Sequence, residues 1–302
     1  MDKENKLKVI YIASGGHSGS TLLSFILGSA KEVFNAGELK YFGSIRDYQN
    51  STIQFMGNRC SCGAEADKCA FWVDIEHDLG PDFQIYTPQG LAARLKLALG
   101  LFLPLRRSHS TADRPSDDYR LGRLILERAR RINPSAQFIL DASKSLDRLF
   151  ALRADPRLDI KVLFLVRDGR GYINSYRKIY GRGFLRWLLQ WIVVNVSARY
   201  YLEKEEIDHY SLSYEQFCDQ PEAFIKEINR HFGISIPVDD YARAVRETVF
   251  HVRAGNPMKG SIKDFQGVFK DQKWQTELPR FQSWLSTALL GAFNRRWVYG
   301  QR

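Results

Sequence analysis

Short apolar runs rich in branched and aromatic residues alternate along the chain with longer stretches of helical periodicity. The runs predict strands at 8–13, 137–141, 161–167 and 209–213. The helical patterns cover 21–28, 90–99, 119–132, 171–180, 184–203 and 221–232, and residues 108–118 and 255–269 read as irregular. Because strands alternate with helices, the pattern predicts an α/β fold with a doubly wound, mainly parallel sheet flanked by helices. Ligands of such sheets bind beyond the carboxyl ends of the strands.

The first predicted strand runs into a glycine-rich turn, which is followed at once by a predicted helix. The turn reads Ser14-Gly15-Gly16-His17-Ser18-Gly19-Ser20-Thr21-Leu22. Backbone N–H groups of such a turn, together with a helix N-terminus, form a seat for an anion. A nucleotide triphosphatase loop ends in Gly-Lys-Ser/Thr, and here Ser20 stands in place of that lysine. The turn therefore indicates a site for a phosphate-like group outside ordinary ATP or GTP chemistry.

A second strand end carries candidate phosphate ligands. The apolar run 162–166 is followed by Arg167-Asp168-Gly169-Arg170, and Ser175 lies eight residues after Arg167 in a predicted helix. A guanidinium and a hydroxyl at this spacing can hold a phosphate between them, the guanidinium through two parallel hydrogen bonds.

Composition narrows the range of partners. The 302 residues are 44% hydrophobic, which supports a core and argues against disorder, and we expect one domain spanning residues 1–302. The formal net charge of +10 favours anionic partners such as nucleotides, nucleic acids, sulfated compounds or a membrane surface. The apolar stretch 95–105 is too short to span a bilayer, and 184–202 carries charged and polar residues. With a charged start that does not resemble a signal peptide, these features predict a soluble cytoplasmic protein.

Three of the four cysteines cluster in the sequence. They are Cys60, Cys62 and Cys69, and Cys218 stands apart. His77 or Cys218 could complete a zinc site, although zinc sites usually show tighter paired spacing. The other interpretations are reduced thiols packed beside Phe71 and Trp72, or one local disulfide.

Together these features resemble the sulfotransferases that use PAPS (3′-phosphoadenosine-5′-phosphosulfate), especially bacterial and tyrosylprotein-type members. The lysine-less turn is similar to their 5′-phosphosulfate loop, and the pair Arg167 and Ser175 is similar to their 3′-phosphate site. Further similar segments are Asn35-Ala36-Gly37-Glu38-Leu39, Leu140-Asp141-Ala142-Ser143-Lys144, Ser213-Tyr214-Glu215-Gln216-Phe217, the cysteine segment 60–72, and 251–274. The resemblance covers about residues 8–275.

The resemblance implies a P-loop-like fold with a donor-binding core at about 8–34, 137–180 and 209–275. It also implies an acceptor-side insertion at about 40–118 and an irregular C-terminal lid. Residues Ser14 to Leu22 would hold the 5′-phosphosulfate, Arg167 and Ser175 the 3′-phosphate, Tyr214 the adenine, and Lys259 would add a phosphate contact from the lid. PAPS would be the donor and PAP (3′,5′-adenosine bisphosphate) the product, with no divalent metal required.

The same resemblance assigns the catalytic groups. Glu38 would be the general base, and burial after an apolar run could raise its pKa. Lys144 would stabilise charge on the bridging oxygen and the sulfuryl group. His17 stands where most relatives carry Lys or Arg. Either His17 is protonated against the bound anion, or Lys144 supplies the charge. His109 is an alternative base.

Two other functions remain open on sequence grounds. One is an ATP-dependent phosphotransferase, in which Asp141 would hold the metal ion. The other is a non-enzymatic basic protein that binds nucleotides or nucleic acid, although the basic residues form no long run. For the sulfotransferase, the expected acceptor is a small molecule, a sugar or a lipid, and no nucleic-acid partner is expected. Segments 46–55 and 80–116 would line the acceptor pocket, and 95–105 with Arg106 and Arg107 could touch a membrane surface.

Overall fold

The chain folds around one five-stranded parallel sheet, seen in a computed structural model that describes residues 6–44, 57–80, 83, 85, 117–181 and 183–300. The strands run in the spatial order β2-β3-β1-β4-β5, and every pairing is parallel. Their bounds are β1 (Leu7–Ser14), β2 (Val33–Gly37), β3 (Phe138–Lys144), β4 (Leu158–Val166) and β5 (His209–Ser213). The predicted α/β fold class and the four predicted strands are confirmed.

Strand β2 was not predicted from the sequence. It has five residues at the sheet edge, and Asn35 interrupts its apolar pattern. The Asn35 amide donates to the Ser24 carbonyl, and its side-chain oxygen accepts from the Gly37 N–H. Asn35 thus ties β2 to the helix before it, which is a tertiary effect that a strand pattern does not carry.

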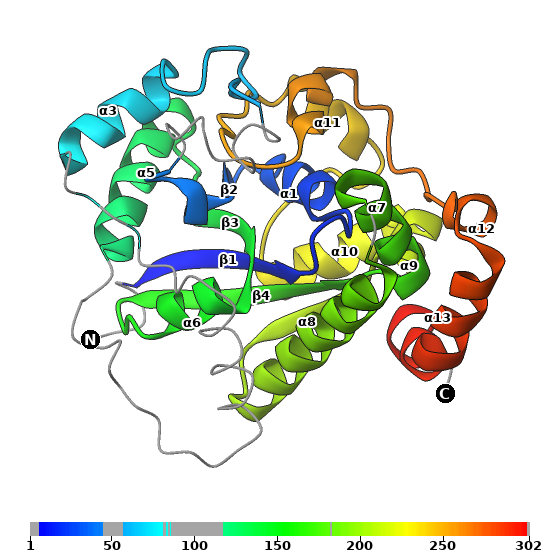
Figure 1. Cartoon of the computed structure of the whole chain (residues 1–302). Coiled ribbons are helices and arrows are strands. Elements are labelled where there is room, and N and C mark those ends of the chain that lie inside the picture. The colour runs from blue at the N-terminus through cyan, green and yellow to red at the C-terminus, as the bar shows by residue number, and fades with distance from the viewer. Residues whose placement is uncertain are drawn as a thin grey trace.

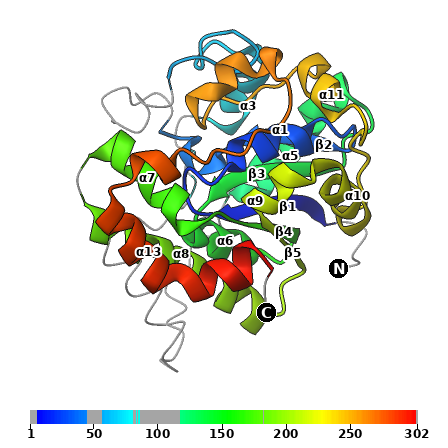
Figure 2. The ribbon, with the colours of Figure 1, turned by 90° about the vertical axis from the view of Figure 1, so that its right-hand side faces the viewer.

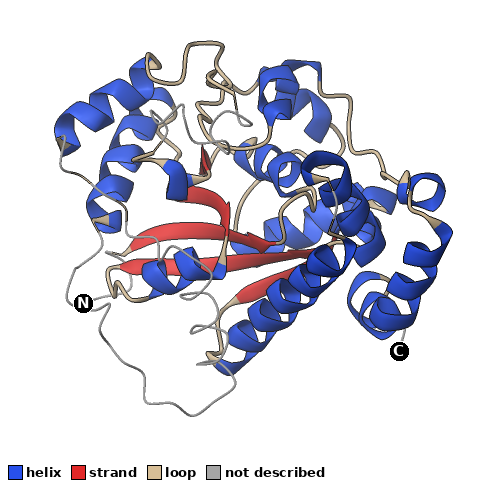
Figure 3. Cartoon of the chain, viewed as in Figure 1, coloured by secondary structure: helices blue, strands red, loops and turns tan. Residues whose placement is uncertain are grey.

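Helices cover both faces of the sheet (Figures 1 and 3). The alternation of side chains along β1 supplies both cores, because Val9 and Tyr11 face one side and Ile10 and Ile12 face the other. The first core includes residues of α3 (Ala70–Leu79), α5 (Asp118–Ile132), α6 (Leu146–Arg153) and α8 (Phe184–Lys204). The second includes residues of α1 (Ser20–Gly28), α9 (Tyr214–Asp219), α10 (Pro221–Phe232) and α11 (Tyr241–Glu247).

The carboxyl-terminal part of the chain packs beside the end of the sheet. Helix α7 (Gly169–Tyr180) follows β4 and contacts α8, and a third apolar cluster joins them to the C-terminal helices. Those helices are α12 (Trp274–Glu277) and α13 (Arg280–Phe293), followed by the π-helical turn Asn294–Val298. Figure 2 shows α13 lying alongside α7 and α8.

Most predicted helices agree with the structure to within two residues. The predicted helix 90–99 lies outside the described residues. The predicted irregular segment 255–269 contains the 3₁₀ helix Pro257–Asp264, and a second 3₁₀ turn spans Leu39–Tyr41. Within the described part of the chain, no helix is both long and apolar enough to cross a bilayer.

The order of strands places a switch point at β1. From this strand the sheet extends through β3 and β2 to one side and through β4 and β5 to the other. Loops that leave neighbouring strands in opposite directions leave a crevice at their carboxyl ends, where ligands of open α/β sheets bind. The glycine-rich turn after β1 lies at this point.

Candidate active site

A pocket of about 590 Å³ lies at the carboxyl ends of the strands, and four of the five strands contribute to it. The turn after β1 supplies residues from Ser14 to Leu22, apart from Ser18. Glu38 follows β2, Lys144 ends β3, and Arg167 follows β4. The sheet therefore brings together most of the residues that the sequence singled out, although they are spread over about 150 positions.

Helix α1 points its N-terminus into this pocket without a cap. Gly19 is the N-cap residue, no side chain caps the helix, and the first turn carries no acidic residue. Ser20, Thr21 and Leu22 line the pocket. The first N–H groups of a helix lack intrahelical acceptors and carry partial positive charge, so this end of α1 favours an anion.

The turn needs glycine where the chain passes close to aromatic rings. Gly19 has a φ of 89°, and a Cβ there would come within 2.7 Å of the Tyr214 ring. A Cβ at Gly16 would clash with the Tyr176 hydroxyl oxygen. Ser18 differs from its neighbours because it is buried and its hydroxyl lies 3.5 Å from the Gly16 carbonyl oxygen. Its hydroxyl therefore packs inside the turn instead of lining the pocket.

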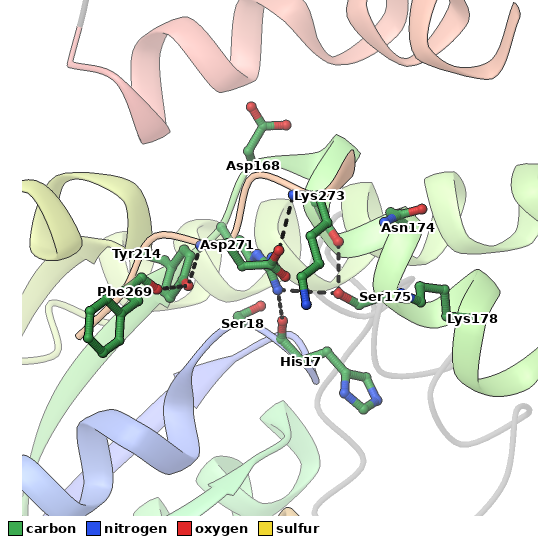
Figure 4. A network of polar contacts seen from close by, with 12 residues as sticks. His17, Ser18, Asp168, Asn174, Ser175, Lys178, Tyr214, Phe269, Asp271 and Lys273 are labelled. Carbon is green, nitrogen blue, oxygen red and sulfur yellow. Dashed lines mark hydrogen bonds and ion pairs between the residues drawn. The ribbon is translucent and has the colours of Figure 1, made fainter. Parts of the chain in front are cut away.

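Arg167 closes the opposite side of the pocket. Its Nη1 donates to the His17 carbonyl oxygen at 2.7 Å and to Ser175 Oγ at 3.3 Å, and its Nη2 donates to Asp271 at 2.9 Å. Figure 4 labels the three partners His17, Ser175 and Asp271. The guanidinium lies over the Tyr214 ring, 4.9 Å from the ring centroid. Its Nε is buried and has no hydrogen-bond partner within the described structure. A buried, fixed cation with an unused donor is suited to an anion.

Charged residues to which the sequence assigned no individual role surround Arg167. Lys273 and Lys178 line the pocket from different segments, and Asp271 forms the ion pair with Arg167. No spacing signal pointed to Asp271 or Lys273, because five α-helices, strand β5 and a 3₁₀ helix lie between Arg167 and Asp271. Figure 4 shows Lys273 and Asp271 beside Ser175, with the Asp168 carboxylate turned away from them.

Glu38 and Lys144 form a close ion pair on the other side of the pocket. Lys144 Nζ donates to Glu38 Oε1 at 2.6 Å, and Lys40 Nζ lies 3.5 Å from the second oxygen. Burial raises the pKa of Glu38, but the charges of Lys144 and Lys40 outweigh burial and hold the pKa below its usual value. The expectation of a raised pKa was therefore wrong, because the sequence could not show that two lysines meet this carboxylate. Glu38 is ionised at neutral pH.

His17 is neutral at neutral pH in this structure. Burial lowers its pKa to about 4, and the nearby charges of Lys144 and Arg167 act in the same direction. Its ring lies edge-on to Tyr176, with 4.8 Å between centroids, and its backbone carbonyl accepts from Arg167. The structure thus favours Lys144 over His17 as the source of positive charge at this position.

Two candidates lie outside the pocket lining. The Lys259 ammonium is buried and donates to the Arg253 carbonyl, so its expected phosphate contact is not supported by its position. Tyr214 packs under Gly19 and Arg167. Its hydroxyl donates to the Phe269 carbonyl and accepts from the Asp271 N–H, and its ring does not line the pocket.

Asp141 is occupied by structural contacts. It is fully buried, accepts from the backbone and side chain of Ser143, and pairs with Arg148, which also binds Asp118. This carboxylate has no free face toward the pocket. It is therefore not available to hold a metal ion beside a bound nucleotide, which argues against the phosphotransferase interpretation.

Backbone strain concentrates at this site. Among the described residues other than glycine, positive φ angles occur at His17 (56°), Lys144 (70°) and Glu206 (46°). The first two flank the pocket. Such conformations cost free energy and persist where surrounding contacts enforce them, which is common at functional sites.

The acceptor side is only partly described. His109, the segment 46–55 and most of 80–116 lie outside the described residues, as do Arg106 and Arg107. Of the two aromatic residues that follow Lys40, Tyr41 lines the pocket, whereas Phe42 packs against Trp72 and Phe83 in the core.

Comparison with solved structures finds sulfotransferases of low similarity. The sulfotransferase domain of the Synechococcus PCC 7002 olefin synthase has 16% sequence identity and a TM-score of 0.47, and the match covers 96% of this chain and 97% of that chain. A sulfotransferase domain of the curacin biosynthetic pathway has 14% identity and a TM-score of 0.48, covering 94% and 97%. A sulfotransferase from Mycobacterium avium has 10% identity and a TM-score of 0.48, covering 97% and 77%.

These structures belong to the class of proteins that the sequence motifs resemble. No family model matches the chain, and no curated protein matches it. TM-scores below 0.5 carry no argument about the reaction, so a functional assignment depends on the geometry of the pocket.

Proposed function

We propose that this protein is a PAPS-dependent sulfotransferase that sulfates a hydroxyl or amine of a small-molecule, sugar or lipid acceptor. One observation carries the proposal: a single pocket holds two separate seats for anions, and a carboxylate lies in the same pocket. The seats are the uncapped N-terminus of α1 and the Arg167–Ser175 pair. PAPS supplies a sulfuryl group on its 5′-phosphate and carries a second phosphate on its 3′-oxygen.

The residues present fit such a donor. The pocket volume of about 590 Å³ falls within the range of nucleotide-sized sites. The N–H groups of Ser20, Thr21 and Leu22 would hold the 5′-phosphosulfate, and the hydroxyls of Ser20 and Thr21 would add donors. The Arg167 guanidinium lines the pocket and is largely buried, so it is the fixed cation expected of a 3′-phosphate site.

The 3′-phosphate seat would need one exchange of partners. Asp271 now accepts from Arg167 Nη2, and its side chain is 41% exposed, so it can turn into solvent when a phosphate takes its place. Lys273 lines the same part of the pocket and would add a second cation there. Lysine and arginine at one phosphate would recognise the group that distinguishes PAP from ADP.

Glu38 and Lys144 would carry the chemistry. Glu38 is ionised and would accept the proton of the acceptor hydroxyl as the oxygen attacks sulfur. Lys144 would move from Glu38 toward the oxygen that leaves sulfur and stabilise the negative charge that develops on it. When Lys144 leaves Glu38, the pKa of Glu38 rises toward its buried value, which makes this carboxylate a better base.

His17 would act as a neutral residue of the turn. Its carbonyl oxygen holds Arg167, so the two anion seats are joined through one hydrogen bond of 2.7 Å. A displacement of Arg167 would therefore also displace the turn. No role for charge on His17 is needed.

Calorimetric titration of the full chain with four nucleotides tests the proposal. PAP, ADP, AMP and ATP with magnesium are compared on wild-type protein, Arg167→Ala and a control variant, Arg243→Ala. Arg243 is a suitable control because it is exposed and pairs with Asp240 and Glu247 on α11.

We expect PAP to bind at least tenfold more tightly than AMP or ADP, and this preference to be lost in Arg167→Ala but kept in Arg243→Ala. Magnesium-dependent ATP binding, or no preference for PAP, would contradict the proposal.

A further inference from the structure

Three cysteines and one histidine meet outside the proposed active site. Cys60 and Cys62 come from the loop before α3, Cys69 is the N-cap residue of α3, and His251 follows α11. One ligand atom from each residue lies within 4.8 Å of the other three. His251 is 182 positions from Cys69, so the fold itself assembles this cluster.

Two of the distances between ligand atoms match those of a tetrahedral metal site. Zinc–sulfur bonds of about 2.3 Å and zinc–nitrogen bonds of about 2.0–2.1 Å place neighbouring ligand atoms about 3.5–3.8 Å apart at tetrahedral angles. Cys62 Sγ lies 3.8 Å from Cys69 Sγ, and Cys69 Sγ lies 3.4 Å from His251 Nδ1. A disulfide would require about 2.0 Å between sulfurs, and all three thiols are free.

The backbone around the cluster is held in place independently of any ion. Cys60 donates its N–H to the Ala64 carbonyl, and Gly63 turns the chain back with a φ of 98°. Ser61 binds the segment around His251, since its Oγ donates to the Phe250 carbonyl and accepts from the Val252 N–H. These bonds fix the loop that carries two thiols against the segment that carries the imidazole.

The imidazole is also oriented by its neighbours. The His251 ring stacks on Phe71 with 5.2 Å between centroids and 16° between planes, and the indole N–H of Trp72 donates to the His251 carbonyl. Ligands whose orientation is fixed by surrounding contacts bind a metal with less loss of freedom.

The charge of a three-thiolate site would be balanced nearby. Three thiolates and one Zn²⁺ leave a net charge of −1. Cys60 and Cys69 interact electrostatically with Arg253, and Cys60 does so with Lys259. Both cations are buried, which gives Lys259 a role at this cluster in place of the phosphate contact expected from the sequence.

We propose that Cys60, Cys62, Cys69 and His251 bind one Zn²⁺ as a structural site. Thiolate and imidazole ligands in tetrahedral array favour zinc over hard cations such as Mg²⁺ or Ca²⁺. Binding releases the thiol protons to solvent, and four protein ligands leave no open position for catalysis. The sequence had suggested His77 or Cys218 as the fourth ligand. Neither joins the cluster, and the His77 side chain is 89% exposed.

This site would support the edge of the active-site pocket. Zinc would fasten the segment after α11 to the start of α3. The same segment accepts the Glu38 N–H at the Ala254 carbonyl and supplies Gly255, Asn256 and Met258 to the pocket lining. The zinc site does not depend on the proposed sulfotransferase activity, because its ligands are separate from the anion seats.

The test measures metal content and coordination in the full chain, purified under reducing conditions. Elemental analysis gives the zinc stoichiometry, and Co²⁺ exchanged for zinc reports tetrahedral thiolate coordination by its visible and charge-transfer bands. The variants are Cys69→Ser, His251→Ala and His251→Cys, with Cys218→Ser as the control that removes a thiol elsewhere. His251→Cys keeps four ligands, so it separates loss of a ligand from loss of the fold.

We expect one zinc per chain in wild type, Cys218→Ser and His251→Cys, and at least tenfold weaker zinc retention against a chelator in the other two variants. Tetrahedral cobalt bands should follow the same pattern. Wild-type protein that takes up neither zinc nor cobalt, or that contains a Cys62–Cys69 disulfide under these conditions, would overturn the proposal. Equal zinc content in wild type and His251→Ala would overturn the assignment of the fourth ligand.

Discussion

The conservative substitution Arg167→Lys tests the proposed 3′-phosphate seat most sharply. Lysine keeps the positive charge but loses the planar fork, so it cannot offer two parallel hydrogen bonds to one phosphate. In the structure, Arg167 Nη1 holds the His17 carbonyl and Ser175. Nη2 and the buried, unpartnered Nε form the other edge of the guanidinium. Asp271 occupies only the Nη2 half of this edge.

The expected loss of affinity follows from the hydrogen bond to the phosphate that lysine cannot replace. Loss of one charge-assisted hydrogen bond costs about 1.5–3 kcal/mol, which corresponds to roughly a 10- to 150-fold loss of affinity. PAP should show this loss because it carries the 3′-phosphate. AMP lacks that group and should lose less than about threefold, through loosening of the turn at His17.

Calorimetry with both ligands on both proteins forms a cycle that isolates the 3′-phosphate contact. Arg243→Lys is the matched control, since it changes an exposed arginine on α11 in the same way. Thermal unfolding of each variant checks that the fold is intact. Equal losses for PAP and AMP would mean that Arg167 acts on the turn alone, and unchanged PAP binding would refute the assignment of the seat.

The remaining predictions concern the turn and the carboxylate. In urea denaturation, Gly19→Ala should reduce the free energy of unfolding by about 1–3 kcal/mol more than Gly233→Ala does. Both glycines have positive φ, but only at Gly19 would a Cβ meet a ring, that of Tyr214. Equal losses in the two variants would contradict this reason. The pKa of His17 is lowered from 6.5 to about 4 by folding, so on acidification the unfolded chain binds a proton at this residue first. The contribution of the neutral His17 ring to the free energy of unfolding is therefore complete above about pH 6.5 and is lost as the pH falls toward 4. His17→Gln should therefore reduce the loss of unfolding free energy between about pH 7 and pH 4 by up to about 3 kcal/mol, and an unchanged loss would show that His17 is not buried as a neutral ring. Glu38→Gln should slow the formation of PAP from PAPS in the presence of an accepted hydroxyl compound by about 10²–10⁴-fold, while the affinity for PAP is retained. A rate within threefold of wild type would exclude Glu38 as the base.

The fold could be predicted from the sequence where local patterns decide it. The continuous apolar run that forms β4 and the regular helix pattern of α10 carry their own signals. Strand β2 does not, because Asn35 is buried in it and its side chain is held by Ser24 on α1 and by the N–H of Gly37 at the end of the strand. The short helices α11 and α12 likewise depend on packing rather than on periodicity.

The part of the candidate site that lies at the ends of strands could be predicted from the sequence. The turn after β1 and the pair Arg167 and Ser175 lie where parallel strands end, so topology alone brings them together. The contacts of Lys144 and Lys40 with Glu38 depend on how the chain turns at the ends of β2 and β3, which the sequence pattern does not show. These contacts lower the pKa of Glu38, whereas burial alone was expected to raise it.

Contacts across long stretches of sequence had no local signal at all. His251 joins the cysteines from 182 positions away, and Asp271 reaches Arg167 from 104 positions away. Lys259 shows the opposite case. The resemblance implied a phosphate contact from the lid, whereas the fold buries the Lys259 ammonium against the Arg253 carbonyl.

The proposed sulfotransferase activity requires that one pocket bind a 3′-phosphorylated nucleotide between the N-terminus of α1 and Arg167. The most direct measurement is a crystal structure of the complex with PAP. We expect the 5′-phosphate on the N–H groups of Ser20 to Leu22, and the 3′-phosphate on Arg167 and Ser175 with Asp271 displaced. A nucleotide bound with its phosphates elsewhere, or with Asp271 still paired to Arg167, would contradict it.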